Sequence, residues 1–260
     1  MTTPKNLIKS RLRGDAVQIG VWLGMGATVP TEIAGAAGFD WAMVDCEHGV
    51  HGIDRMRDSL VALQSVGCAS GVRVADNQSW MIKQALDCGA QTILVPMVNT
   101  VAEAQKAVQS TFYPPVGARG MASGVVRASG YGADADYVAQ AGAQICLMVQ
   151  AETRQAVENV DEIAALDGVD CIFVGPSDLA ADMGYHGDSS VPEVQEAIAH
   201  VQARARAAGK GAAMFCMSPA ELPKYRDMGA NFLAVASDVV SFAAAMRGRV
   251  AEAKDALGQT

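Results

Sequence analysis

A short pattern that recurs along the chain constrains the fold more than any other feature. In each copy a helix-like stretch ends at a glycine, and an apolar run rich in β-branched residues begins after two further residues. Glycine favours the left-handed position that ends a helix, and a continuous apolar run is typical of a strand buried on both faces. Each copy therefore predicts the junction between a helix and a parallel strand. The copies are Gly38-Phe39-Asp40-WAMVD, Gly89-Ala90-Gln91-TILVP, Gly168-Val169-Asp170-CIFVG and Gly229-Ala230-Asn231-FLAVA.

Further strand-like runs bring the predicted total to eight. Eight parallel strands with intervening helices predict a single (β/α)8 TIM barrel over residues 1–260, with an extra helix at its N-terminus. A doubly wound sheet is the alternative, but segment 24–26 lacks the third glycine of the dinucleotide fingerprint. The further runs are QIGVWL (18–23), SGVRV (70–74), QICLMVQ (144–150) and GAAMFC (211–216). Apolar spacing of three to four residues predicts helices over 54–66, 78–87, 153–166, 191–208 and 238–256.

Composition and charge exclude several classes of protein. Hydrophobic residues make up 50% of the chain and charged residues 18%, which favours a packed globule over a disordered or coiled-coil chain. The net charge is -8 and no Lys/Arg stripe is present, so nucleic acid and anionic membranes are poor partners. No apolar run approaches the roughly 20 residues of a membrane span, and no secretory signal is recognisable. The six cysteines lack C-x-x-C spacing, so we expect reduced thiols and a cytoplasmic protein.

The residues that follow the predicted strands are unusually polar, and in a TIM barrel these strand ends carry the chemistry. Glu152 and Asp178 follow adjacent strands, so their carboxylates could converge on one hard divalent cation. Alternatively, Ser177 or Asp178 could cap the helix near Leu179, and Glu152 could begin the helix over 153–166. The strand-end residues are Trp22, Asp45, Cys46, Glu47, His48, Arg73, Gln150, Ala151, Glu152, Gly175, Pro176, Ser177, Asp178, Phe215, Ser237 and Asp238.

Two basic side chains at these ends are candidates for catalysis. His48 is flanked by Asp45 and Glu47 at the barrel mouth and could act as a general base. Nearby His51 is expected to be a solvated loop residue. Arg73 lies on an interior strand, where an unpaired guanidinium is costly to bury. It therefore either pairs with a carboxylate of the protein or contacts a substrate oxyanion.

Other features exclude mechanisms or mark a functional loop. No lysine lies at the C-terminal end of a predicted strand, which disfavours a Schiff-base mechanism. The loops after the last two strands lack the glycines of a barrel phosphate site, so a sugar phosphate is disfavoured as substrate. Segment 111–137 is long, rich in glycine and without a clear period, as functional loops often are. Its Arg119 and Arg127 are candidates for anion contacts or for an oligomer interface, and the interface is favoured.

Five motifs together point to a known family. They are VDCEHG (44–49), the stretch from GVRV to LDCGAQTILVPMV (71–98), YPPVGARG (113–120), VQAET (149–153) and GPSDLAADMGY (175–185). Over nearly its whole length the chain resembles the metal-dependent (class II) pyruvate aldolases, typified by 4-hydroxy-2-oxoheptanedioate aldolase and 2-dehydro-3-deoxyglucarate aldolase. Cys46 replaces a glycine common in that family, and Ala151 replaces a larger aliphatic residue, changes that bear on the preferred acceptor.

The resemblance implies a TIM barrel whose C-terminal helix is exchanged between paired subunits of a homo-hexamer, a trimer of dimers. It also implies an enzyme that cleaves 4-hydroxy-2-oxo acids reversibly to pyruvate, or a close 2-oxo acid, and an aldehyde, in the catabolism of aromatic compounds. The alternatives are a metal-dependent lyase of acyl-CoA thioesters, a decarboxylase of oxaloacetate-like acids, and a barrel that binds a ligand without catalysis. The chain shows no basic groove for a CoA nucleotide, and its charged strand ends argue against a purely binding role.

The resemblance assigns roles to individual residues. Glu152 and Asp178 would hold Mg²⁺, Mn²⁺ or Co²⁺, while His48 would be the acid/base and Arg73 would contact the pyruvyl oxygen. Asp87 matches the family's aspartate partner of that histidine, although its position at a helix end also suits a capping or structural role. The implied substrate-binding residues are Trp22, Asp45, Gln150, Gly175, Pro176, Ser177 and Phe215, with Trp22 and Phe215 on the acceptor side.

Overall fold

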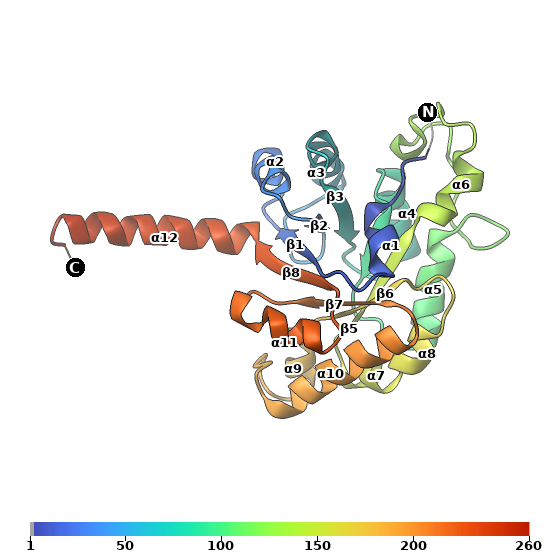
Figure 1. Cartoon of the computed structure of the whole chain (residues 1–260). Helices are drawn as coiled ribbons and strands as arrows, with labels where there is room; N and C mark the ends of the chain where they lie inside the picture. The colour runs from blue at the N-terminus through green and yellow to red at the C-terminus, as the bar shows by residue number, and fades with distance from the viewer. Residues whose placement is uncertain (1–2, 260) are drawn as a thin grey trace.

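The computed structural model describes residues 3–259 and forms a closed barrel of eight parallel strands (Figure 1). The strands pair in chain order, and the last closes against the first. This order confirms the predicted TIM barrel and excludes the doubly wound sheet, in which the strand order reverses. The strands are β1 (Gln18–Leu23), β2 (Trp41–Asp45), β3 (Ala69–Arg73), β4 (Thr92–Val95), β5 (Cys146–Ala151), β6 (Cys171–Val174), β7 (Gly211–Phe215) and β8 (Phe232–Ser237).

Helices surround the barrel on its outer side (Figure 1). No helix within residues 3–259 combines the length and apolar character needed to cross a bilayer. The helices after β1 are α2 (Thr28–Ala36), α3 (Ile53–Ser65), α4 (Ser79–Asp87), α5 (Val101–Thr111), α6 (Tyr137–Gln144), α7 (Arg154–Glu158), α8 (Val160–Ala164), α9 (Pro176–Asp182), α10 (Pro192–Ala207), α11 (Leu222–Asp227) and α12 (Asp238–Ala256), with short 3₁₀ turns η1 (Arg127–Ser129) and η2 (Pro219–Glu221).

The prediction of one continuous helix over 153–166 is wrong, because the structure has two short helices there, α7 and α8. Asn159 ends the first helix and begins the second, with a ψ of 5°. Its side-chain amide donates a hydrogen bond to the carbonyl of Asn99, 2.8 Å away in the loop before α5. This tertiary contact holds the break in a segment whose apolar spacing favours one helix. Between α5 and α6 the chain forms only η1, as expected for the loop over 111–137.

The extra N-terminal helix, α1 (Leu7–Leu12), closes the N-terminal end of the barrel. Ile8 and Leu12 are each 1% exposed and join the cluster of side chains that fills the barrel interior. The side chain of Asn6, just before the helix, donates hydrogen bonds to the carbonyl of Gln91 and to the hydroxyl of Thr92, both at 3.1 Å. Apolar packing and these hydrogen bonds together seal one end of the barrel.

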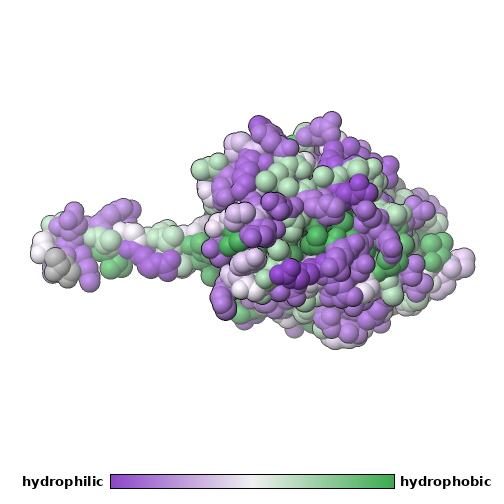
Figure 2. All heavy atoms as spheres, turned by 90° about the horizontal axis from the view of Figure 1, so that it is seen from below, coloured by the Kyte–Doolittle hydropathy of each residue, from purple (hydrophilic) through white to green (hydrophobic). Residues whose placement is uncertain are grey.

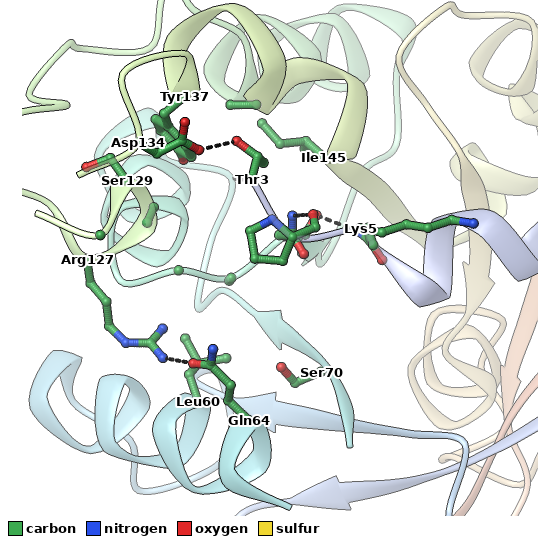
Figure 3. Close-up of a pocket in the computed structure, with 18 of the residues that line it drawn as sticks. Thr3, Lys5, Leu60, Gln64, Ser70, Arg127, Ser129, Asp134, Tyr137 and Ile145 are labelled. Atoms are coloured by element: carbon green, nitrogen blue, oxygen red, sulfur yellow. Dashed lines mark hydrogen bonds between the residues drawn. The ribbon is translucent and has the colours of Figure 1, made fainter. Parts of the chain in front are cut away.

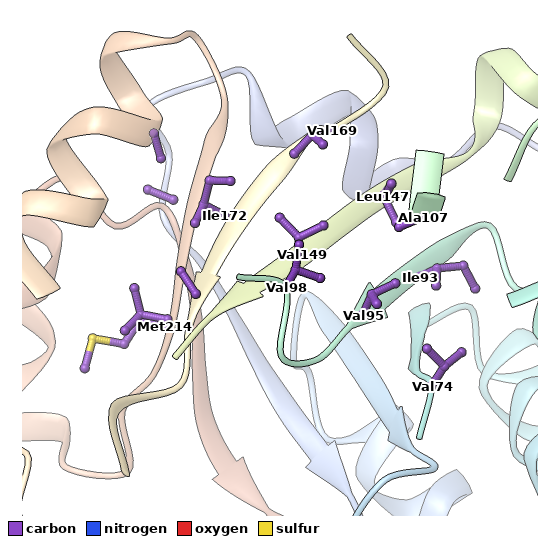
Figure 4. Packing of buried hydrophobic residues seen from close by; sticks show 14 of the residues in the cluster. Val74, Ile93, Val95, Val98, Ala107, Leu147, Val149, Val169, Ile172 and Met214 are labelled. Atoms are coloured by element: carbon purple, nitrogen blue, oxygen red, sulfur yellow. The ribbon is translucent and has the colours of Figure 1, made fainter. Parts of the chain in front are cut away.

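Alternation along each strand sorts the side chains into an inner and an outer layer. In β2, Trp41, Met43 and Asp45 point into the barrel, while Ala42 and Val44 pack beneath the helices. The outer layer is shown from close by in Figure 4, with valine, isoleucine and leucine side chains of neighbouring strands in contact. The same alternation puts the last inward residue of several strands at the C-terminal mouth. These residues are Trp22, Asp45, Arg73, Gln150 and Phe215.

Helix α12 stands apart from this packed body. It is a helix of 19 residues, and none of them is buried. Figures 1 and 2 show it projecting from the barrel, with hydrophobic and hydrophilic residues side by side along its length. The helix has the bounds predicted from its sequence. It contacts β1, β8 and α2, but these contacts within residues 3–259 bury none of its apolar side chains.

Replacement of Gly20 by alanine tests the packing of the barrel interior. A Cβ atom on Gly20 would lie 2.0 Å from the ring of Trp41, which stacks on Phe232 with ring centroids 3.9 Å apart. We expect Gly20→Ala to lower the free energy of unfolding by about 2 kcal/mol, the usual cost of overpacking. Gly52→Ala is the matched control because no heavy atom lies within 4 Å of its Cβ position. Urea unfolding of the two variants should differ clearly, and equal midpoints would contradict the packing described.

Candidate active site

A buried ion pair joins the ends of two neighbouring strands at the C-terminal mouth of the barrel. Asp45 and Arg73 stand opposite each other in the register of β2 and β3. The guanidinium donates from Nε to Asp45 Oδ1 at 2.9 Å and from Nη2 to Oδ2 at 2.8 Å. Its remaining nitrogen, Nη1, lies 2.7 Å from Oε2 of Glu47. Arg73 therefore pairs with protein carboxylates, one of the two alternatives expected from the sequence.

Glu152 lies in a cradle of neutral hydrogen-bond donors directly after β5. Its Oε1 accepts from the backbone N–H of Met97 at 2.8 Å, and its Oε2 accepts from the side-chain amide of Gln150 at 2.6 Å. The residue is 2% exposed. The backbone of Gly175 forms another side of this cradle. Position 175 has no room for a side chain, because a Cβ atom there would lie 2.2 Å from Oε2 of Glu152. Thr153, not Glu152, caps α7, so the alternative role of Glu152 at the helix start is wrong.

Asp178 reaches the same region from the first turn of α9. The N-cap of this helix is Gly175, Pro176 follows it, and no side chain makes a capping hydrogen bond. The alternative in which Ser177 or Asp178 serves as a cap is therefore wrong. Ser177 and Asp178 are exposed, whereas Gly175 is buried. Because Gly175 lies against Oε2 of Glu152, Asp178 follows three residues after a direct neighbour of Glu152, and its charge raises the Glu152 pKa.

The carboxyl groups of the site differ in how their surroundings shift their pKa values. Burial raises the pKa of Glu152 to about 7, against the hydrogen bond from Met97, and the charges of Asp178 and Glu47 add to this increase. Burial also raises the pKa of Glu47, although Arg73 opposes it. Burial acts in the same direction on Asp45, but the hydrogen bonds and charge of Arg73 outweigh it and lower the Asp45 pKa. The acidic neighbours of Glu152 therefore oppose its ionisation, and the charge of Arg73 opposes them only in part.

The two histidines of the loop after β2 have opposite environments. The side chain of His48 is 70% exposed, and its Nε2 lies 4.0 Å from Oε1 of Glu47. His51 is only 8% exposed, and its Nδ1 lies 2.9 Å from the carbonyl oxygen of Asp45. The expectation of a solvated His51 is wrong, because the loop turns back and packs the imidazole against the end of β2. His51 thereby anchors the loop that presents His48.

An aromatic wall borders the ion pair. Trp22 is 7% exposed, and its ring lies beneath the Arg73 guanidinium at 5.0 Å from the ring centroid. Phe215 meets Trp22 edge to face at 5.5 Å between centroids and is partly exposed. Both side chains thus stand at the mouth beside Arg73, where a cation over an indole face is favourable.

Asp87 lies elsewhere in the fold. It is the last residue of α4, which runs from the C-terminal end of β3 back to the N-terminal end of β4. Its carboxylate accepts a hydrogen bond from the fully buried Arg119 at 2.7 Å. The Arg119 guanidinium also lies over the ring of Tyr113 at 4.5 Å. The structure therefore does not bring Asp87 to His48 within one chain. Arg119 makes its anion contact with a carboxylate of the protein itself, that of Asp87.

A separate cavity of about 600 Å³ lies at the N-terminal end of the barrel, between the N-terminal segment, α3 and the segment around η1 (Figure 3). Arg127 lines it and donates hydrogen bonds to the carbonyl of Cys88 at 2.9 Å and to the side chain of Gln64. These contacts anchor the segment between α5 and α6 to the ends of α3 and α4. The cavity is at the opposite end from the strand-end carboxylates, so it is not part of the candidate active site.

The donor set fits a hard divalent cation. Among residues 3–259 no three His, Cys, Asp or Glu side chains are grouped closely enough to form a complete protein cage. Two carboxylates with open positions, however, are the arrangement that leaves room for water and substrate oxygens. The neutral cradle of Glu152 satisfies its hydrogen bonds without balancing its charge, and a cation would supply that balance. Glu152 and Asp178 are the residues that would hold it.

Met97 is the member of this site that sequence reasoning missed. It contributes through its backbone N–H, and its φ of 53° is unusual for a residue other than glycine. No side-chain chemistry marks such a role. The segment VPMV lies within one of the five motifs, which is the single sequence signal that could have drawn attention to it.

Comparison with known proteins identifies the family of the chain. Residues 18–245 match the HpcH/HpaI aldolase/citrate lyase family. A hydroxypyruvate/pyruvate aldolase from Agrobacterium fabrum is 45% identical over 254 residues, which cover 98% of this chain and 96% of the relative. A 5-keto-4-deoxy-D-glucarate aldolase from Shigella boydii is 45% identical over 240 residues, covering 92% and 93%. A solved structure of a family protein from Burkholderia cenocepacia has a TM-score of 0.92 at 38% identity, covering 96% of this chain and 100% of that one.

The protein is therefore an enzyme of the carbon–carbon lyase class. More particularly, the chain belongs to the HpcH/HpaI aldolase/citrate lyase family. This assignment confirms the resemblance to aldolases that the five motifs indicated.

The raised pKa of Glu152 predicts a pH dependence of stability in chelator-treated protein. Between pH 4.5 and about 7 the folded protein retains a proton on Glu152 that the unfolded chain has released. The free energy of unfolding should therefore fall as the pH rises through this window, by up to about 3 kcal/mol. Urea unfolding at several pH values measures the slope. Glu152→Gln should lose this contribution and the exposed Glu158→Gln should retain it, whereas parallel curves for all three proteins would refute the assignment.

Proposed function

We propose that this enzyme is a divalent-metal-dependent aldolase that cleaves 4-hydroxy-2-oxo acids reversibly to pyruvate, or a close 2-oxo acid, and an aldehyde. The observation that carries this proposal is the buried Glu152 in its neutral cradle at the barrel mouth, with Asp178 after the neighbouring strand and the Arg73–Asp45 ion pair at the same mouth. The relatives named as hydroxypyruvate/pyruvate aldolase and 5-keto-4-deoxy-D-glucarate aldolase support a 2-oxo acid substrate.

Glu152 and Asp178 would hold Mg²⁺, Mn²⁺ or Co²⁺. When bound, such an ion supplies positive charge beside the substrate's oxygen atoms and makes an enolate less costly to form. Arg73 adds a fixed cation that Asp45 and Glu47 hold in one orientation. A preorganised cation of this kind stabilises charge that develops on a substrate oxyanion without having to reorient during the reaction.

His48 would move the proton at C3 of the 2-oxo acid. Two observations support this role: its imidazole is exposed at the mouth, and His51 anchors its loop. The loop from Gly175 to Ser177 would hold the substrate carboxylate beside Glu152. Gln150 contributes an amide whose Oε1 has no hydrogen-bond partner among residues 3–259 and could therefore accept one from substrate.

The acceptor aldehyde would lie against the aromatic wall. Trp22 and Phe215 present ring edges and faces at the mouth, next to the Arg73 guanidinium. A wall of this kind excludes water from one side of the enolate and favours an apolar portion of the aldehyde. Asp45 acts by holding Arg73 and by accepting hydrogen bonds from the backbone N–H groups of Glu47 and His48 at 3.0 and 3.3 Å.

We propose in addition that the enzyme is a homo-hexamer in which α12 is exchanged between paired subunits. The helix leaves Val239, Phe242, Met246 and Val250 at 45% exposure or more, spaced as one stripe. Such a stripe on a projecting helix is typical of a surface that a second copy covers. For Asp87 to serve His48 as its acidic partner, it would have to come from another copy, because the two lie apart within one chain. Cytoplasmic location and a role in aromatic-compound catabolism remain predictions.

Metal removal tests the proposed reaction. Chelator-stripped enzyme should release no pyruvate from 4-hydroxy-2-oxo acids, and Mg²⁺, Mn²⁺ or Co²⁺ should restore the release. Glu152→Ala and Asp178→Ala should each lower the restored rate at least a hundredfold, because each removes one of only two protein ligands. Coupled detection of pyruvate measures the rate. The exposed Glu158→Ala variant is the control and should keep the wild-type rate.

Two outcomes would overturn this proposal. Cleavage that persists without metal would exclude the cation from the reaction. Absence of cleavage with every metal, across a panel of aldehydes and 2-oxo acids, would exclude the aldolase reaction itself.

Charged substitutions on the apolar stripe of α12 test whether this helix holds the subunits together. Phe242→Glu combined with Met246→Glu should reduce the mass measured by light scattering, because two carboxylates would be buried in the paired interface. Ala244→Glu is the matched control, since residue 244 lies on the opposite side of the helix from the stripe and is exposed. An unchanged mass of the double variant, or a monomeric wild type, would refute the exchanged helix.

A further inference from the structure

The turn between β4 and α5 carries an unusual backbone at the candidate site. Met97 has a φ of 53°, in the left-handed region that residues with side chains seldom adopt. Its N–H donates to Oε1 of Glu152 at 2.8 Å. The N–H of Val98 donates to the carbonyl of Gln150 at 3.2 Å. Two successive amides of the turn therefore face the end of β5.

Contacts on the far side of the turn hold it in this conformation. The Thr153 hydroxyl donates to the Asn99 side chain at 2.6 Å, and the Asn159 amide donates to the Asn99 carbonyl at 2.8 Å. Strained backbone persists where the surrounding structure determines it in this way, and such places cluster at functional sites. The Met97 side chain is 47% exposed, so burial of that side chain does not explain the conformation.

The conformation of this turn affects the orientation of the Glu152 carboxylate. Glu152 has two oxygens, and each accepts one hydrogen bond from a neutral N–H group. Gln150 holds Oε2 through a side chain that can rotate, whereas Met97 holds Oε1 through the main chain. A main-chain donor has little freedom, so it fixes the carboxylate plane more firmly. The remaining lone pairs of Glu152 are then directed by the turn.

We propose that Met97 is a positioning residue whose left-handed backbone, and not its side chain, orients Glu152 for a divalent cation. This inference rests on the proposed function, in which Glu152 is a metal ligand. Residues that orient a ligand by hydrogen bonding typically change metal affinity ten- to a hundredfold when they are altered. A substitution of Met97 would act by changing how readily residue 97 adopts a positive φ.

Three substitutions at position 97 separate the backbone from the side chain. Met97→Leu keeps a large unbranched side chain, Met97→Gly removes the side chain but allows a positive φ, and Met97→Val resists a positive φ because it is β-branched. The Mn²⁺ dissociation constant of chelator-stripped protein, measured by titration calorimetry, is the readout. We expect the Leu and Gly variants to stay within about threefold of wild type and the Val variant to bind at least tenfold more weakly.

Tyr131→Val is the matched control for backbone strain. Tyr131 has a φ of 58° but lies beside the N-terminal cavity, so its valine variant should lose stability to urea without a change in Mn²⁺ affinity. Equal affinities of the Val and Leu variants would overturn the positioning role. A loss confined to the Gly variant would overturn it too, by assigning the effect to the side chain. Failure of wild type to bind Mn²⁺, or unaltered binding by Glu152→Ala, would instead overturn the proposed function on which it rests.

Discussion

The bidentate ion pair between Asp45 and Arg73 organises the mouth of this barrel. Buried charges are tolerated only where geometry satisfies them, and here the register of β2 and β3 places the two residues opposite each other. The pair has further effects on its surroundings. Asp45 accepts hydrogen bonds from the loop that carries His48, and Arg73 reaches Glu47 and lies over Trp22. One salt bridge thus determines where a histidine, a carboxylate and an indole stand.

Charge balance distinguishes the two halves of the site. On the β2 and β3 side, Arg73 compensates its carboxylates directly. On the β5 and β6 side, Glu152 receives only neutral donors, and the approach of Asp178 makes its ionisation harder. A protein that only needed stability would gain from an apolar residue at such a position. The half around Glu152 is therefore the part of the barrel in which the proposed cation would complete the electrostatics.

Much of this arrangement follows from the sequence because barrel strands obey a strict period. In WAMVD, every second residue points inward, so the period alone places Asp45 at the mouth. Contacts between segments far apart in the chain do not follow in this way. The burial of His51 depends on how its loop returns to β2, and the break at Asn159 depends on a hydrogen bond to Asn99, 60 residues away. The partner of Asp87 was likewise unpredictable, because Arg119 follows it by 32 residues.

The seal that α1 forms at the N-terminal end has a consequence for the order of binding. With Ile8 and Leu12 packed into the interior, the N-terminal end is closed, and reactants and products must share the C-terminal mouth. Glu152 and Gln150 lie at its floor, each no more than 3% exposed, while His48 and Asp178 stand at its rim. A molecule bound to the floor is covered by whatever binds next. In the proposed reaction, the molecule bound at the floor would therefore enter first and leave last.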